Sequence, residues 1–158
     1  MGAPILERVH EQLRPVVEVS SFSAGTLVLV VPVSELLGTV RRLGSEFAFD
    51  LLLDVTAVDW PAQKPRFEVV YHLYSTTHHV RVRVKTRVPE EDPSVDSLVT
   101  LYGSARFAER ECHDMYGIVF RGNPDLRPIL LYEGFVGHPL RKDYPKEQEQ
   151  PLVRYRDA

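Results

Sequence analysis

Two neighbouring runs of alternating apolar and polar residues constrain the fold of this chain more than any other feature. Residues 66–74 and residues 80–88 each turn apolar side chains to one face, and the second run turns cations to the other face. A period of two is typical of strands that are covered on one side only. Ser75–His78 between the runs is typical of a hairpin loop, so the pattern predicts an antiparallel pair. The apolar members are Phe67, Val69, Tyr71, Leu73, Val80, Val82 and Val84, and the cations are Arg81, Arg83, Lys85 and Arg87.

The other segments before Gly117 predict a small set of helices and strands around this pair. Apolar spacing predicts a helix that ends at Pro15 and a second that runs from Pro32 to Phe47. Further expected elements are strands at 16–22 and 26–31, a central strand at 49–60, a short helix at 94–102 that begins at Asp92-Pro93, and a helix that Ser104 caps and Gly117 ends. The sequence therefore predicts an α+β domain, an antiparallel or mixed sheet with packed helices.

The last third of the chain follows different rules. Five of the twelve prolines fall after residue 120, and no helical or strand period persists there. The segment is nevertheless apolar, with Ile129, Leu130, Leu131, Tyr132, Phe135, Val136, Leu140 and Tyr144. We expect a domain at 1–118 and an extended C-terminal arm for partner binding at 119–158. Such an arm wraps its own domain or lies on another protein, and we favour the second.

Composition excludes most kinds of chemistry for the chain alone. The net charge of −3 among 158 residues gives no global attraction to nucleic acid or anionic lipid. A single cysteine, Cys112, makes no internal disulfide and cannot hold an iron–sulfur cluster. The first residues lack the apolar core of a signal peptide, and no apolar run approaches the roughly 20 residues of a membrane span. We expect a soluble chain, with membrane contact only through a partner.

Two groups of reactive side chains have simpler interpretations. His78 and His79 are adjacent, so on a strand they point to opposite faces and fit a polar turn better than a metal site. Cys112, His113 and Asp114 diverge by roughly 100° per residue on a helix and do not converge on one atom. Cys112 then fits the apolar stripe as a core residue, and His113 is expected to pair with Glu109.

Charges of both signs recur among apolar residues at 109–114, 125–127 and 141–143. A desolvated charge needs a counter-charge or hydrogen bonds, whereas an isolated surface charge does not need apolar neighbours. The pattern indicates polar anchoring of the extended arm.

Three of these segments resemble the thirty-kilodalton subunit, or C subunit, of respiratory complex I, NADH:quinone oxidoreductase. Residues 109–118 (ERECHDMYGI) resemble its ERE-x-x-D-[LM]-[FY]-G-I motif, residues 124–130 its HPDLRRIL, and residues 133–145 its EGF-x-GHPLRKD[FY]P. Residues 53–60 (LDVTAVDW) are similar to an upstream strand of the family. Asn123 and Pro128 depart from the second motif, which puts the hydrogen bonding of that loop in question.

The resemblance implies a non-catalytic scaffold in the peripheral arm of a proton-translocating complex. No cofactor is expected in this chain; FMN and iron–sulfur clusters, which carry electrons from NADH to quinone, belong to partner subunits. The expected partners are the forty-nine-kilodalton-type subunit, or D subunit, and other peripheral-arm subunits, with no nucleic acid, at the cytoplasmic face of the cell inner membrane. The isolated chain is expected to have no activity.

The resemblance also marks candidate interface residues: Glu109, Arg110, Glu111, Asp114, Tyr116, Gly117, Asp125, Arg127, Glu133, Gly137, His138, Pro139, Arg141, Lys142 and Asp143. The acidic and basic residues at 109–114 would fix the helix end and its contacts with the arm or a partner. Gly117 and Gly137 would permit sharp turns, and the residues at 138–143 would supply hydrogen bonds and ion pairs to the interface.

Two alternatives remain. The equivalent subunit of a membrane-bound group 4 [NiFe] hydrogenase or formate hydrogenlyase shares these motifs. A module of another class would bind RNA through the basic strand, although RNA-binding sheets pair their cations with exposed aromatic rings, and the neighbouring strand offers only His72 and Tyr74.

Overall fold

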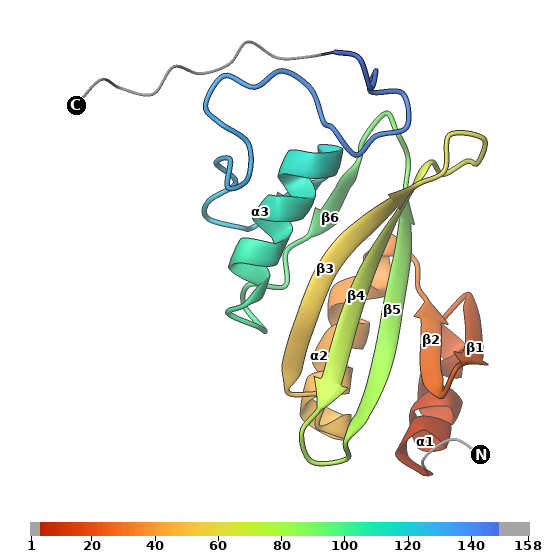
Figure 1. The fold of residues 1–158 in the computed structure, drawn as a ribbon. Helices are drawn as coiled ribbons and strands as arrows, with labels where there is room; N and C mark the ends of the chain where they lie inside the picture. The colour runs from red at the N-terminus through yellow and green to blue at the C-terminus, as the bar shows by residue number, and fades with distance from the viewer. Residues whose placement is uncertain (1–3, 149–158) are drawn as a thin grey trace.

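A five-stranded mixed sheet forms the centre of the protein in the computed structural model, which describes residues 4–148 (Figure 1). The strands lie in the order β1-β2-β5-β4-β3. Their bounds are Val19–Ser23 for β1, Thr26–Val30 for β2, Leu51–Asp59 for β3, Phe67–Ser75 for β4 and Val80–Val88 for β5. The prediction of an α+β fold with an antiparallel or mixed sheet is confirmed.

The predicted hairpin of residues 66–74 and 80–88 is present, and the strands expected at 16–22 and 26–31 form a second hairpin. β4 pairs with β5 in antiparallel register from Phe67 opposite Val88 to Ser75 opposite Val80. β1 pairs with β2 in the same manner around the turn at residues 24–25. The sheet is mixed because β2 lies parallel to its neighbour β5. The strands β3 and β4 lie between these two strands in the sequence.

Two helices cover the same face of the sheet, which is the far face in Figure 1. They are α1, Pro4–Leu13, and α2, Leu36–Phe47, each flanked by a short 3-10 helix, η1 at Arg14–Val16 and η2 at Val33–Glu35. Their apolar stripes pack on the alternating residues of β4 and β5 in one continuous core. Burial of such large side chains stabilises the fold by about 1.5–3 kcal/mol each. Fully buried members include Phe47, Phe67, Tyr71, Leu36, Leu43 and Leu73.

The strand expected at 49–60 forms as β3 at Leu51–Asp59, but its expected place at the centre of the sheet is wrong. β3 is an edge strand, and α3, Ala105–Tyr116, lies along it (Figure 1). Its apolar composition reflects burial beneath that helix and not a second neighbouring strand. Ser104 precedes α3 as predicted, but its hydroxyl donates to the carbonyl of Leu52 at 3.0 Å and makes no side-chain cap.

The helix predicted at 94–102 is also absent. Ser94–Asp96 forms β6, which pairs in parallel with β7, Val119–Arg121, and turns follow up to Tyr102. The pairing continues beyond the strand, where the Ser97 amide donates to the carbonyl of Arg121 at 2.8 Å. A partner strand that is distant in sequence therefore outweighs the local Asp-Pro signal for a helix.

Residues 122–148, here called the arm, contain no helix or strand. Figure 1 shows the arm running beside α3 and then crossing its C-terminal end toward the sheet. Over these residues the arm lies on its own domain, the first of the two alternatives weighed above. The remainder of the predicted arm, 149–158, lies outside the described residues, and the predicted boundary at 118 stays a prediction.

Candidate functional site

The first residues of the arm are attached to a buried carboxylate of α3. Glu109 of α3 has no exposed surface. It accepts hydrogen bonds from the Ser97 hydroxyl at 2.6 Å, the Leu98 amide at 2.7 Å and the Asn123 side-chain amide at 2.8 Å. These donors are all neutral, so burial prevails and raises the pKa of Glu109 above its ordinary value. Asn123, a departure from the family motif, thus closes a hydrogen-bonded loop.

Arg110, one residue further along α3, holds the next part of the arm by its backbone. Its guanidinium donates to the carbonyls of Arg127 and Pro128, both at 2.9 Å. Pro128 is the second departure from the family motif. It takes part in this contact through its carbonyl, so its lack of a backbone N–H does not affect the contact. Asp125 pairs with Arg127 at 2.9 Å, and this guanidinium holds the pKa of Asp125 far below its usual range.

Asp114 fixes three successive amides of the arm with one oxygen. Its Oδ2 accepts from the backbone N–H groups of Ile129 at 2.7 Å, Leu130 at 2.9 Å and Leu131 at 3.4 Å. Asp114 lies on the last turn of α3 and is buried. One side chain here satisfies backbone donors that a strand partner would satisfy in a sheet.

The arm in turn caps the end of α3. His138 Nδ1 donates to the carbonyl of Asp114 at 2.9 Å, and Arg141 Nε donates to the carbonyl of Tyr116 at 2.7 Å. These carbonyls belong to the last turn, which has no donor partners within the helix and carries a partial negative charge. A cation and an imidazole N–H from a distant part of the sequence thus complete the helix.

Gly117 permits this contact in two ways. Its φ of +75° is left-handed, as expected of a helix C-cap, which confirms the predicted turn. A Cβ at this position would also lie 2.5 Å from His138 Nε2 and 2.6 Å from Arg141 Nη2. Gly137 repeats the arrangement with a φ of +102° and the Tyr144 ring 2.7 Å from where its Cβ would be.

A cluster of ions holds the arm to the end of the sheet. We call Asp59, Arg66, Glu90 and Asp143 the clasp. Arg66 forms a bidentate pair with Asp59 at 2.7 and 2.8 Å and also donates to Asp143 at 3.0 Å and to Glu90. Its guanidinium is only 8% exposed, and it holds the pKa values of Asp59 and Asp143 below their ordinary range.

The three predicted interface residues at 141–143 contact the clasp or the adjacent Phe67 ring, each in a different way. Asp143 forms an ion pair with Arg66 of the same chain, and its predicted role at a partner interface stays a prediction. Lys142 contributes its backbone N–H, which donates to Asp59 Oδ2 at 2.7 Å. Arg141 stacks on the Phe67 ring with its guanidinium carbon 5.0 Å from the centroid, and Arg66 approaches the same ring at the same distance.

Sequence reasoning missed Asp59 and Arg66, which are central to the clasp. Asp59 stands at the end of an apolar strand, within a segment that resembles the family, and Arg66 directly precedes the alternating run of β4. A charge that closes an apolar strand is the signal that could have identified both. The predicted pair of His113 with Glu109 is wrong, because His113 Nδ1 donates to the carbonyl of Ile118 at 2.8 Å.

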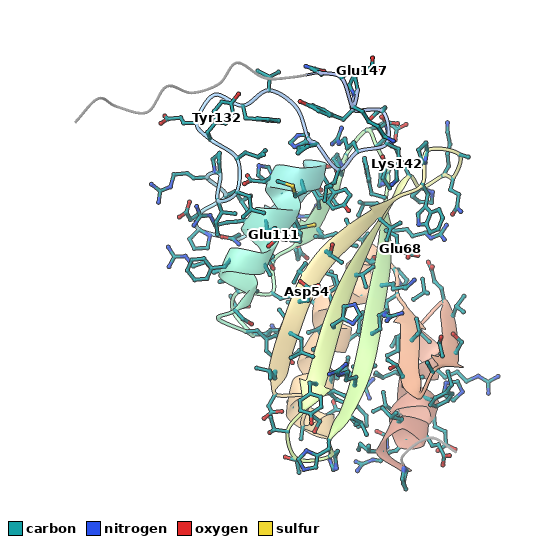
Figure 2. All side chains as sticks on the ribbon, viewed as in Figure 1. Asp54, Glu68, Glu111, Tyr132, Lys142 and Glu147 are labelled. Atoms are coloured by element: carbon teal, nitrogen blue, oxygen red, sulfur yellow. The ribbon has the colours of Figure 1, made fainter. Side chains whose placement is uncertain are left out.

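The remaining candidate residues make few contacts. Glu111 and Glu133 are exposed, and their side chains form no hydrogen bond or ion pair within residues 4–148. Tyr116 is half-buried, and burial raises the pKa of its hydroxyl. Pro139 is half-buried beside the His138 and Leu140 contacts. Figure 2 shows Glu111 on α3, Tyr132 on the arm beside it, and Lys142 at the end of the sheet.

The anchors face inward, whereas five apolar side chains of the arm are exposed. Leu130 is 60% exposed and Val136 is 67% exposed, although Asp114 holds the backbone amide of the former. A surface of this kind, apolar and attached by polar groups beneath, is typical of protein interfaces. Its exposed apolar members are Ile129, Leu130, Tyr132, Val136 and Leu140.

Cys112 is the one cysteine within residues 4–148. Cys112 is buried, as predicted, and burial raises the pKa of its thiol. In the same range, His, Cys, Asp and Glu side chains form no group of three or more that could hold a metal ion. Among the described helices, none has the length and apolarity needed to cross a membrane.

Comparison with known proteins gives concordant matches. A family model described as the 30 kDa subunit of the respiratory-chain NADH dehydrogenase matches residues 29–150. The C subunit of NADH-quinone oxidoreductase from Brucella abortus (strain 2308) is 45% identical over 139 residues, which cover 87% of this chain and 68% of the relative. The Methylobacterium radiotolerans protein of the same name is 42% identical over 145 residues, covering 90% and 67%.

Two solved structures share the fold. One is described as Nqo5 of the trypsin-resistant fragment (1-134); it has a TM-score of 0.70 and 34% identity and covers 77% of this chain and 99% of its own. The other belongs to the membrane-bound sulfane sulfur reductase, an archaeal respiratory membrane complex. It has a TM-score of 0.80 and 27% identity, and covers 98% of this chain and 94% of its own.

Proposed function

The chain belongs to the 30 kDa subunit family of the respiratory-chain NADH dehydrogenase, and we propose that its arm is the surface by which it holds a neighbouring subunit. It is a peripheral-arm subunit of complex I, NADH-quinone oxidoreductase, and it supports electron transfer from NADH to quinone as a structural component. The proposal concerns how the chain performs that role.

The observation that carries the proposal is the opposition between the two sides of the arm. Its backbone and cations are engaged by α3 and the clasp, whereas Leu130, Leu140 and their apolar neighbours remain exposed. Burying such side chains against a partner stabilises the contact by roughly 25 cal/mol for each Å² removed from water. The anchors hold these side chains in fixed positions, as a docking surface requires.

We infer that the chain alone catalyses nothing and that FMN and iron–sulfur clusters are held by its partners. The inert, buried Cys112 supports this inference, because a thiol with a raised pKa is neither a ready nucleophile nor a cluster ligand. The D subunit is the partner we propose for the arm, at the cytoplasmic face of the cell inner membrane.

A second assignment is favoured by one specific likeness. The structure of the archaeal sulfane sulfur reductase complex covers nearly the whole chain, so a related membrane-bound complex, including the group 4 hydrogenases, could use the same subunit form. The 45% identity with the Brucella abortus complex I relative exceeds the 27% identity with that chain, which supports complex I.

Recovery of partners from native membranes tests both points. A tagged full-length chain should bring down the D subunit together with a flavin-bearing NADH dehydrogenase module. The Leu130→Asp variant should lose most of this recovery, because a carboxylate in an apolar interface has no partner. Val19→Asp is the matched control, since Val19 is 56% exposed on β1 and lies away from the arm.

Equal recovery with the two variants would contradict the proposal that the arm is the interface. Recovery of a partner with nickel-ligating cysteines and no NADH module would indicate that the chain belongs with the hydrogenase relatives instead. Circular dichroism of each variant checks that the fold persists, since both sites are exposed.

A further inference from the structure

The sheet has a second face that no helix covers within residues 4–148. α1 and α2 pack on the far face, and α3 lies along the β3 edge (Figure 1). We call the near face of β4 and β5 the open face. It consists of Glu68, Val70, His72, Tyr74, Arg81, Arg83, Lys85 and Arg87.

Positive charge is in excess on the open face. Glu68 is the one carboxylate of the face, and it pairs with both Lys85 at 2.8 Å and Arg87 at 3.6 Å. Arg81 and Arg83 form no ion pair among the described residues, and the Nε of Arg83 has no hydrogen-bond acceptor. Four cations therefore face one anion, in a chain whose net charge is −3.

The strand neighbours of the face do not restore the balance. Arg83 lies opposite His72 on β4, and His72 lies opposite Asp54 on β3. Burial and then the Arg83 charge lower the pKa of His72, while Asp54 opposes them less strongly. The field at the centre of the face is therefore positive, even with Asp54 included.

The centre of the face is covered by the side chains of the face itself. Val70 is 5% exposed and Glu68 is 5% exposed, although no helix lies over them. Long cationic side chains on the neighbouring strand lie over apolar surface and keep their charged ends in water. The charged ends of these side chains are therefore the groups that a partner would meet on this face.

We propose that the open face is a docking surface, separate from the arm, for an acidic segment of a neighbouring protein subunit, whose carboxylates pair with Arg81 and Arg83. A partner carboxylate would supply an acceptor to the terminal nitrogens of these two guanidiniums, which form no ion pair among the described residues. The proposal goes beyond the role of the arm, because the two surfaces lie on different elements and share no residue.

Other occupants fit the face less well. A second copy of the chain would bring like charges together, which is unfavourable. RNA would find few rings for base stacking, because His72 and Tyr74 are half-buried and the Tyr74 hydroxyl contacts His79 Nδ1 at 3.2 Å. The acidic protein segment is the occupant that the charges and the missing rings favour.

Zero-length cross-linking in the purified complex tests the proposal directly. A carbodiimide joins an amine to a carboxylate in contact with it, but native Lys85 would report Glu68 of its own chain. The Arg81→Lys and Arg83→Lys variants keep the charge and place an amine where no carboxylate of residues 4–148 forms an ion pair. Arg41→Lys, at an exposed arginine of α2 on the other side of the sheet, is the control.

We expect cross-links from positions 81 and 83 to aspartate or glutamate residues of another subunit, at several times the yield from position 41. Cross-links from 81 and 83 that reach only this chain, or none while other lysines react, would overturn the proposal. Because all three variants conserve charge, assembly through the arm proceeds in each, and a failure here is distinct from a failure of the arm proposal.

A binding measurement on the full chain separates protein from nucleic acid. The probes are a labelled glutamate-rich peptide of twelve residues and a labelled oligouridylate of twelve nucleotides. Arg81→Glu with Arg83→Glu should weaken peptide binding about tenfold, whereas Arg14→Glu with Arg41→Glu, the same charge change on α2 and beside α1, should not. Two outcomes would refute the proposal of an acidic segment. The first is an equal loss of peptide binding in both double variants, and the second is RNA binding that is tighter than peptide binding and is abolished only by Arg81→Glu with Arg83→Glu.

Discussion

The domain at 4–121 and the arm at 122–148 pair their backbone N–H and C=O groups by different means. In the domain, backbone N–H and C=O groups pair with one another along β4, β5 and the helices, and apolar side chains fill the interior. In the arm, backbone groups pair with side chains, above all Asp114, Arg110 and Asp59. Several apolar side chains of the arm, among them Leu130 and Val136, remain exposed.

This difference shows what each region depends on. The domain rests on many buried side chains that share one continuous core. The arm rests on a few carboxylates and guanidiniums, each of which holds several groups. Single substitutions at these anchors should therefore uncouple the arm while the domain stays folded, except at the clasp, which belongs to both regions.

The largest effect is expected from Asp59→Ala. The substitution leaves buried Arg66 without its bidentate partner and the Lys142 amide without its acceptor. Loss of one member of a buried pair typically costs about 3–5 kcal/mol, and we expect the free energy of unfolding to fall by about that amount. Urea unfolding measures it, with Asp54→Asn, an exposed carboxylate on the same strand, as the control. Equal stability of the two variants would show that the clasp does not join the regions.

Asp114→Ala should separate the regions more cleanly. It frees the amides of Ile129, Leu130 and Leu131, and the expected destabilisation is about 1–3 kcal/mol. Hydrogen exchange should accelerate at these amides and remain slow in β4 and β5. Glu111→Ala on the same helix should leave both patterns unchanged. Acceleration throughout the sheet would mean that the arm is part of the cooperative domain.

Gly117→Ala compared with Gly122→Ala isolates the contact between the helix end and the arm. Both glycines have positive φ, so both substitutions carry backbone strain, but only a Cβ at 117 meets the arm. We expect the first variant to be about 1 kcal/mol less stable than the second, with faster cleavage of the arm by trypsin. Indistinguishable variants would mean that the His138 and Arg141 side chains move aside without cost.

The smallest effect is a difference in pH dependence. Glu109 has a pKa above its ordinary 4.5, so the folded state binds more protons, and its contribution to stability falls as pH rises from about 4.5 through the folded value. Asp59 and Asp143 have pKa values below 3.8, so their contribution is lost as pH falls below about 3.8. Urea unfolding between about pH 2 and pH 8 should show both trends, and Glu109→Gln should remove only the first. A variant that keeps the decline above pH 4.5 would assign it to another group.

Local patterns predicted the domain better than the arm, for a physical reason. The alternation at 66–74 and 80–88 reports one-sided burial directly, and Gly117 marks a helix end that its own backbone requires. The helix expected at 94–102 failed because β7 captures that segment from a distance. The site was predicted as a set of charged residues without its pairings. Lys142 and Asp59 lie 83 residues apart, and no local period reports such a contact.

The three amides that share Asp114 have a consequence for the kinetics of assembly. Fixing the backbone of a residue costs about 1–2 kcal/mol in conformational entropy. In this chain that cost falls within the folding of the monomer, before any partner is met. Association is then an encounter of two preformed surfaces, and its rate should approach the roughly 10⁵–10⁷ M⁻¹s⁻¹ that is typical of rigid docking, without a slow step in which the arm folds on its partner.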